Sequence, residues 1–364
     1  MELTRKLSIG FIGTRGIPNE YGGYEAAVQE LAPRLASMGH RVVVYCSKAQ
    51  LSRFKTWNGV ELIYSYDPES KIGSAGQFVY DFLSNIKSRN QNHDVIFHMG
   101  CTSDSIWHGL WDKSALHITN MDGIEWRRSK YSKLARKFLK YAERLAANNS
   151  SVLIADNKGI EEYIHDNYNA EVVNISYGVE IPESFNNEIL KTYTLEERNY
   201  DIVVARIVPE NNIEEIIKAK LICHDNRPLV IFGNRTNFRD ELVARYLNNR
   251  NIIFIDGNFN KQEMDSLRHF SRYYIHGHSV GGTNPSLLES MAAKCKIIAH
   301  DNPFNRNVLQ EEGRYFETSN DLAAILQSDL QILSNEKTLK LLSENHNWQI
   351  ICKQYETVAY KNKS

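Results

Sequence analysis

The sequence is dominated by short apolar runs that alternate with segments of helical period, and this alternation restarts once in mid-chain. In the first half the apolar runs are LSIGFIG (7–13), RVVVYCS (41–47), DVIFHMG (94–100), ALHITNM (115–121) and SVLIADN (151–157). In the second half they are YDIVVAR (200–206), PLVIFGN (228–234), NIIFIDG (251–257), RYYIHGH (272–278) and KIIAHDN (296–302). Strands that alternate with helices form a parallel sheet covered by helices on both faces. We therefore expect an α/β protein with two Rossmann-like, doubly wound parallel sheets.

A chain of 364 residues is long for one core, which also favours two domains. The polar connection at 175–197 separates the two series and is the expected linker. We expect an N-terminal domain over 1–180, a C-terminal domain over 181–345 and a final helix over 346–364 that crosses back to the first domain. Open parallel sheets bind ligands at the carboxyl ends of their strands. The expected binding site is therefore an interdomain cleft lined by the loops that follow strands.

Composition narrows the classes of function. Lys+Arg 43 against Asp+Glu 44 gives a formal net charge of -1, so no global field attracts nucleic acid. No apolar run approaches the ~20 residues of a membrane-spanning helix, and MELTRKLSIGFIG is interpreted as a first strand rather than a signal peptide. Five scattered cysteines without a CxxC pair favour a reducing cytoplasm and argue against a disulfide framework or a zinc site.

The first loop of interest is GTRGIPNEYGGYE (13–25), which contains the pair Gly22 and Gly23. Glycines let the backbone approach a ligand closely, and the following helix offers N–H groups to an anion. The GxxG spacing and the absence of an acidic residue after the second strand disfavour a nicotinamide dinucleotide. A flexible loop without a ligand is the alternative.

Two loops of the second half are expected to hold phosphate groups. Arg206 ends a strand, where a guanidinium suits a pyrophosphate, although pairing with Glu210 or Glu214 is the alternative. In HSVGGTNPSLLESMAAK (278–294), Asn284 is a suitable N-cap and Pro285 a suitable first helical residue. The backbone of Gly281, Gly282 and Thr283 would then face a phosphate at the helix N-terminus.

Glu289 lies among apolar residues of the same helix. A carboxylate there is costly unless it is hydrogen-bonded. A ribose diol would satisfy it with two hydroxyl donors, and a structural bond to nearby backbone is the alternative.

The segment NMDGIEWRRSK (120–130) places Asp122 and Glu125 at a strand end of the first domain. From Trp126 the range 126–146 carries eight Lys/Arg interleaved with aromatic and apolar residues, which predicts a basic amphipathic helix. Such a helix could lie on an anionic membrane, and an ordinary solvated helix is the alternative.

Four segments resemble one known family. They are IGTRGIPNEYGGYEAAVQELAPRLASMGHRVVVYC (12–46), NMDGIEWRRSK (120–130), RIVPENN (206–212) and GGTNPSLLESMA (281–292). They resemble GT-B glycosyltransferases of family four, in its bacterial rhamnosyltransferase-like branch, and the resemblance spans nearly the whole chain. It implies that Glu289 binds the ribose hydroxyls, that Arg206 holds the pyrophosphate, and that Gly22 and Gly23 lie near the donor phosphates and transferred sugar.

The assigned roles follow from the loops and the resemblance together. The expected donor-binding residues are Arg206, Gly281, Gly282, Thr283, Asn284, Glu289, Gly22 and Gly23. Asp122 is the expected catalytic residue, as base or acceptor-orienting group, and Arg15, Tyr24 and Glu125 are the expected acceptor or sugar contacts.

Three positions depart from the family's pattern. Gly281 stands where many members have a second glutamate, and Asn211 stands where they have a lysine. Asp122 replaces a histidine that contacts a donor's 6-hydroxyl, which fits a 6-deoxy sugar such as rhamnose.

The sequence thus predicts a retaining, metal-independent glycosyltransferase without a cofactor. Its expected donor is dTDP-L-rhamnose, and its expected acceptor is lipid-linked or a saccharide in surface polysaccharide synthesis. The expected location is the cytoplasm, peripheral on the inner face of the plasma membrane. The alternatives are a UDP- or GDP-linked donor, a sugar-nucleotide epimerase, a nicotinamide-dependent oxidoreductase and a non-catalytic sugar-nucleotide-binding scaffold.

Overall fold

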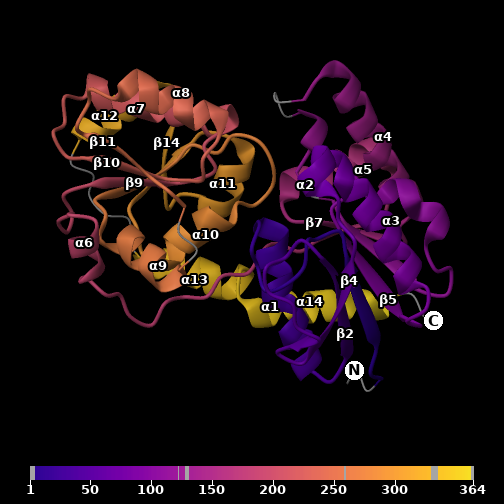
Figure 1. The fold of residues 1–364 in the computed structure, drawn as a ribbon. Helices are drawn as coiled ribbons and strands as arrows, with labels where there is room; N and C mark the ends of the chain where they lie inside the picture. The colour runs from indigo at the N-terminus through magenta and orange to yellow at the C-terminus, as the bar shows by residue number, and fades with distance from the viewer. Residues whose placement is uncertain (1–4, 122, 128–130, 258–259, 329–334, 362–364) are drawn as a thin grey trace. The chain divides into compact units, whose positions relative to one another are not determined.

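The computed structural model describes residues 5–121, 123–127, 131–257, 260–328 and 335–361. The chain divides into two compact units (Figure 1). Unit 1 comprises Met1–Tyr177 together with Trp348–Ser364, and unit 2 comprises Gly178–Asn347. The last helix, yellow in Figure 1, therefore belongs to the unit formed by the first half of the chain.

Unit 1 is built on an eight-stranded sheet in the order β3-β4-β2-β1-β5-β6-β7-β8. Pairing is parallel throughout, except that β3 runs antiparallel to β4. The strands are β1 (Ser8–Ile12), β2 (Arg41–Ser47), β3 (Thr56–Trp57), β4 (Val60–Ser65), β5 (Val95–Met99), β6 (Leu116–Asn120), β7 (Val152–Ala155) and β8 (Val172–Asn174).

Helices cover both faces of this sheet. They are α1 (Gly23–Ser37), α2 (Glu69–Ile72), α3 (Gly76–Ser88), α4 (Lys133–Asn149), α5 (Lys158–Tyr168) and α14 (Trp348–Tyr360), with 3-10 turns η1 (Gly73–Ala75), η2 (Ser105–Leu110) and η3 (Glu125–Arg127). The main core packs apolar residues of α1 and α14 against one face, as with Leu31 and Ile351 against Phe97. On α3, Tyr80 donates its hydroxyl to the carbonyls of Thr14 (2.6 Å) and Tyr45 (2.7 Å).

Unit 2 is built on a six-stranded parallel sheet in the order β11-β10-β9-β12-β13-β14. The strands are β9 (Asp201–Val204), β10 (Leu229–Phe232), β11 (Ile252–Ile255), β12 (Tyr273–His276), β13 (Ile297–His300) and β14 (Arg314–Phe316). The helices are α6 (Ile189–Thr192), α7 (Ile213–Ile222), α8 (Asn237–Tyr246), α9 (Lys261–Phe270), α10 (Pro285–Ala292), α11 (Pro303–Leu309), α12 (Ser319–Gln327) and α13 (Asn335–Asn345), with the 3-10 turn η4 (Pro209–Asn211). Helices α7, α8 and α12 share one core cluster on one face, and α9, α10 and α13 lie on the other (Figure 1).

Both sheets reverse their winding direction once. In unit 1 the reversal falls between β1 and β5, and in unit 2 between β9 and β12. The loops that leave the carboxyl ends of such neighbouring strands diverge to opposite faces, which makes this point the usual ligand site of doubly wound sheets. The expected α/β class with two doubly wound sheets is confirmed, and the site is sought at these two points.

The helix expected over 126–146 begins later than the charge pattern suggested. Residues Glu125–Arg127 form a 3-10 turn, and α4 starts at Lys133. Ser132 has an extended backbone and its hydroxyl accepts from the N–H of Ala135 at 3.3 Å, so it caps the helix there. No helix in the described part of the chain is long and apolar enough to cross a membrane.

Candidate functional site

In unit 2 the loop after β9 and the turn after β12 are joined by hydrogen bonds. The amide of Asn212 donates to the carbonyl of Gly277 at 2.9 Å. Ser279 donates both its N–H (3.1 Å) and its hydroxyl (2.7 Å) to the carbonyl of Glu210. Because β9 and β12 are neighbours at the reversal point, these bonds turn two separate loops into one surface at the carboxyl edge of the sheet.

Asn211 has a structural task in this surface. It is buried, its amide donates to the carbonyl of Arg206 at 2.6 Å, and its Oδ1 lies 2.8 Å from Nδ1 of His278. Asn211 stands where the resembled family has a lysine. Its amide side chain instead holds the backbone carbonyl of Arg206 and the ring of His278. Next to it, a Cβ on Gly277 would lie 2.1 Å from the carbonyl oxygen of Asn211, so only glycine allows the two loops to approach this closely.

Arg206 is an exposed cation at this edge, two residues beyond the end of β9. Within the described residues it makes no ion pair or side-chain hydrogen bond. Glu210 and Glu214 are the two carboxylates that could pair with Arg206. Glu214 instead pairs with Arg245 and lies 3.6 Å from Lys218. Glu210 is buried. An exposed guanidinium without a protein counter-ion is suited to bind an anion.

Helix α10 begins where the sequence predicts. The side chain of Asn284 accepts from the N–H of Ser286 at 2.9 Å, and Pro285 is the first helical residue. Gly281, in the preceding loop, has a φ of 118°, a value that side-chain-bearing residues rarely adopt. The loop formed by Gly281, Gly282 and Thr283 therefore leads directly into the positive end of the α10 dipole.

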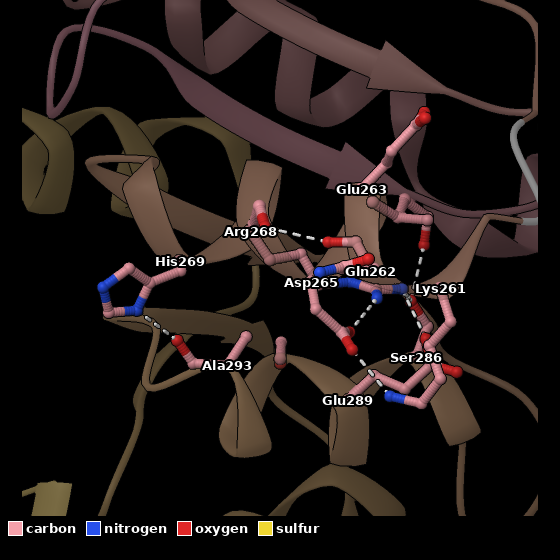
Figure 2. A network of polar contacts seen from close by, with 12 residues as sticks. Lys261, Gln262, Glu263, Asp265, Arg268, His269, Ser286, Glu289 and Ala293 are labelled. Carbon is pink, nitrogen blue, oxygen red and sulfur yellow. Dashed lines mark hydrogen bonds and ion pairs between the residues drawn. The ribbon is translucent and has the colours of Figure 1, made fainter. Parts of the chain in front are cut away.

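Glu289 has a partner that the sequence did not suggest. Arg268 on α9 donates from Nη2 to Oε2 of Glu289 at 2.5 Å and to Oγ of Ser286 at 3.1 Å (Figure 2). The guanidinium side chain is 3% exposed, whereas that of Glu289 is 34% exposed. The other carboxylate oxygen, Oε1, has no hydrogen-bond partner among the residues that the structure describes.

The charges of this cluster balance. Arg268 also lies 3.2 Å from Asp265, which in turn pairs with Lys261 at 2.6 Å (Figure 2). Burial acts to lower the pKa of Arg268, but Glu289 and Asp265 outweigh it and hold that pKa above the ordinary value, so the guanidinium is a cation. Burial also raises the pKa of Asp265, against the opposing effect of Lys261 and Arg268. Two cations and two carboxylates thus share the space beneath α10.

In unit 1 the guanidinium of Arg15 is engaged by protein groups. It donates to both carboxylate oxygens of Glu69, at 2.8 and 2.9 Å, and stacks over Tyr21 with 3.8 Å to the ring centroid. The backbone N–H of Arg15 donates to Glu25 at 2.8 Å. Glu25 is buried and was not singled out from the sequence, although its place two residues after the glycine pair in GGYE was a signal for it.

The start of α1 is open. Gly22 is the N-cap and provides no side-chain cap, and a Cβ on Gly23 would meet nothing within 4 Å. Gly100 directly follows the last residue of β5. The ring of Tyr24 lies close to it, because a Cβ added to Gly100 would be 3.4 Å from that ring. The N-terminus of α1 therefore lies near the reversal point of the unit 1 sheet.

Asp122, the expected catalytic residue, lies outside the described residues. Glu125 is half-buried, and its Oε2 accepts from the hydroxyl of Tyr131 at 3.3 Å. Among the described residues no group of three or more His, Cys, Asp or Glu side chains could hold a metal ion.

Helix α4 of unit 1 exposes cations and apolar side chains together. Its exposed charged residues are Lys133, Lys137, Lys140 and Arg144, and its exposed large hydrophobic residues are Leu134, Phe138 and Tyr141. Glu143, the one acid of the helix, is buried and accepts from the hydroxyls of Tyr163 (2.7 Å) and Tyr168. The exposed face of α4 therefore carries no negative side chain.

Comparisons with known proteins agree with this architecture. Residues 6–180 match the model of a family described as a domain of unknown function (DUF1972), and residues 185–347 match the model described as glycosyl transferases group 1. A comparison with curated protein sequences gives no match.

Solved structures of the same fold span both units. Sucrose-phosphate synthase from Thermosynechococcus elongatus is similar with a TM-score of 0.80 at 15% identity, over 97% of this chain and 98% of that one. Anabaena HepE in complex with UDP has a TM-score of 0.74 at 13% identity, over 97% and 99%. The α,α-trehalose 6-phosphate synthase from Burkholderia multivorans has a TM-score of 0.73 at 10% identity, over 97% and 98%. The fold is GT-B, and the match of residues 185–347 supports a glycosyltransferase.

Gly277→Ala tests whether the two unit 2 loops must approach this closely. The added Cβ would overlap the Asn211 carbonyl, and we expect a loss of about 1–3 kcal/mol in the free energy of unfolding. Gly109→Ala is the matched control, because a Cβ there meets nothing within 4 Å. Equal melting temperatures for the two variants in thermal denaturation would contradict the tight contact.

Proposed function

We propose that the protein is a retaining, metal-independent nucleotide-sugar glycosyltransferase. Unit 2 would bind the nucleoside diphosphate, and unit 1 would present the acceptor. The observation that carries the proposal is the exposed, unpaired Arg206 at the reversal point of unit 2, in a loop that is hydrogen-bonded to the turn preceding α10. This cation lies at the place where doubly wound sheets hold phosphate-bearing ligands.

The groups at this edge suit the chemistry of the leaving diphosphate. Negative charge builds on the diphosphate as its bond to the sugar breaks, and fixed hydrogen-bond donors stabilise such charge without rearranging. Arg206 and the backbone N–H groups of the 281–284 loop and α10 would supply them. Glu289 would accept a hydroxyl of the nucleoside sugar through Oε1, while Arg268 holds its other oxygen.

Two similar structures support a nucleotide-sugar substrate. The Anabaena HepE structures contain UDP, and one contains UDP and glucose. For this chain we propose dTDP-L-rhamnose as donor and a lipid-linked or saccharide acceptor in surface polysaccharide synthesis. The reason is the resemblance of the 12–46 and 120–130 segments, with Asp122 where a 6-hydroxyl contact is otherwise made. Asp122 remains the proposed base or acceptor-orienting group.

Arg206→Ala tests the diphosphate site. A hydrogen bond to a charged group contributes about 1.5–3 kcal/mol, so the Kd of UDP or dTDP should rise roughly ten- to hundredfold in calorimetry. The melting temperature should not change, because no described residue depends on this side chain.

Arg314→Ala is the matched control for this experiment. Arg314 is also exposed, but it starts β14 and so lies at the opposite, amino-terminal edge of the same parallel sheet. The proposal predicts unchanged binding in this variant. Nucleotide binding that is equal in both variants and the unaltered protein would refute the role of Arg206.

We also propose that α4 rests on an anionic membrane surface, where a lipid-linked acceptor would be found. Its exposed face combines four cations with Leu134, Phe138 and Tyr141. Apolar side chains enter the interface while the cations meet anionic headgroups. The inward position of Glu143 removes the one charge that would oppose this contact.

Lys137→Glu combined with Lys140→Glu tests the membrane contact. Each Lys near an anionic surface contributes about 1 kcal/mol, so losing two should lower partitioning onto phosphatidylglycerol vesicles by at least roughly thirtyfold, and the two added carboxylates should lower it further. Lys337→Glu with Lys340→Glu, on α13, makes the same charge change at the same spacing and should leave vesicle binding largely intact. Equal sedimentation with vesicles for both double variants would argue against docking through α4.

A further inference from the structure

The indole of Trp126, in the turn η3 that follows β6, is fixed by a directed chain of hydrogen bonds. An indole N–H can only donate, and that of Trp126 donates to the hydroxyl of Tyr163 on α5 at 3.1 Å. This hydroxyl in turn donates to Glu143 of α4 at 2.7 Å. Burial and Glu143 together raise the pKa of Tyr163 to about 12, so the donated proton stays on the phenol. The turn is therefore tied to both α4 and α5.

Two exposed cations lie near this fixed ring. Nζ of Lys140, on α4, is 4.7 Å from the ring centroid of Trp126. Cζ of Arg127 is 5.4 Å from the same centroid and 5.3 Å from that of Tyr163. Neither cation makes an ion pair or a conventional hydrogen bond within the part of the chain that the structure describes. An exposed cation–π contact is weaker than a charge-assisted hydrogen bond, so an anion can draw either side chain away from the ring.

The two acids nearest in sequence are engaged by tyrosines rather than by these cations. Glu143 follows Lys140 by three residues on α4, but it is buried and accepts from the hydroxyls of two tyrosines. Glu125 directly precedes Trp126 and is half-buried, and its Oε2 accepts from the hydroxyl of Tyr131. The positive charge of the two cations is therefore available to an anion from outside the protein.

The location of this cation pair matches the layout of a lipid-linked acceptor. Lys140 belongs to the exposed cationic and apolar face of α4, which we propose to rest on a membrane. Arg127 belongs to the turn that follows β6 and contains Glu125, a proposed acceptor contact. In a prenyl diphosphate-linked saccharide the charged group likewise lies between an apolar chain in the membrane and the sugar that reacts.

We propose that Arg127 and Lys140 bind the diphosphate of a lipid-linked acceptor, and that Trp126 holds the two cations near this site. The inference rests on the proposed function, of which it names the acceptor class. Two cations balance the two negative charges of a diphosphate diester, and a guanidinium can bind a phosphate through two parallel N–H groups. The saccharide attached to the diphosphate then begins beside the turn η3.

The first experiment measures binding of geranyl diphosphate, a soluble prenyl diphosphate, by calorimetry without vesicles. The full chain carries Arg206→Ala throughout, which removes the competing diphosphate site proposed in unit 2. Adding Arg127→Gln and Lys140→Gln should raise the Kd roughly tenfold or more, because charge-assisted hydrogen bonds are lost. Absence of binding before these changes, or an unaltered Kd after them, would overturn the inference.

Lys133→Gln with Lys137→Gln is the matched control in the same Arg206→Ala background. It also removes two exposed cations of unit 1, but neither side chain contacts an aromatic ring among the residues that the structure describes. The Kd of geranyl diphosphate should stay within about threefold, since distant surface charges are screened by salt. An equal loss of affinity in both double variants would mean diffuse charge attraction and would overturn the site.

The second experiment separates the two chemical sources of phosphate. Glycerol 1-phosphate, a soluble analogue of a phospholipid headgroup, should bind the Arg206→Ala chain roughly tenfold more weakly than geranyl diphosphate, because it offers one phosphate instead of two. Equal affinities would indicate a general phosphate site and would overturn the assignment to a diphosphate.

Binding of UDP keeps the inference and the proposed function distinguishable. In the chain with Arg206 intact, Arg127→Gln with Lys140→Gln should leave the Kd of UDP within about threefold, since both residues belong to unit 1. A parallel loss of UDP binding would mean general damage to the fold and would overturn the local role of the two cations. Absence of UDP binding by the unaltered chain would overturn the proposed function alone, because the unit 1 site is measured without that nucleotide.

Discussion

The hydrogen bonds between the 206–212 loop and the 277–279 turn are the contacts on which the candidate site depends. They join the carboxyl ends of β9 and β12, the two strands between which the sheet of unit 2 reverses its winding. Without them Arg206 and the start of α10 would belong to independent loops. Gly277 makes the approach possible. Asn211 contacts the turn through its Oδ1 and His278, while its amide NH2 holds the carbonyl of Arg206 within the loop. The protein thereby holds the backbone that carries Arg206 beside the turn that leads into α10.

A second constraint lies beneath this surface. A buried guanidinium needs carboxylates around it, and the cluster of Lys261, Asp265, Arg268 and Glu289 meets that need with no net charge. One carboxylate of the cluster, Glu289, is 34% exposed, so the buried network reaches the surface of unit 2 there. Arg268 thus links α9 to α10 through both Ser286 and Glu289.

The sequence predicted those features that repeat or that act locally. Apolar runs such as RVVVYCS (41–47) gave strands with the expected bounds, and Asn284-Pro285 marked the start of α10 because capping depends on adjacent residues. Strands β3, β4, β8 and β14 were not predicted. Strands β3, β8 and β14 have only two or three residues, which carry no period, whereas the six-residue β4 was missed in spite of its length. The expected helix at 126–146 was placed too early, because its charge pattern continues through a 3-10 turn that Ser132 separates from α4.

Long-range pairs were beyond sequence reasoning. The partner of Glu289 is 21 residues away on another helix, and nothing in the local pattern around Arg268 identifies it. The engagement of Arg15 by Glu69, 54 residues later, was equally hidden, as was the inward turn of Glu143 toward two tyrosines. Such contacts are decided by how helices pack on a sheet, which periodicity does not encode.

The central claim is that the chain transfers a sugar from a nucleotide to an acceptor. The most direct measurement is release of nucleoside diphosphate by the full chain from a panel of nucleotide sugars, each with and without a lipid-linked saccharide acceptor. The account predicts release that requires the acceptor and is fastest with dTDP-L-rhamnose among the donors. Conversion of a donor without any acceptor, or no release from any donor in the presence of acceptor, would contradict it.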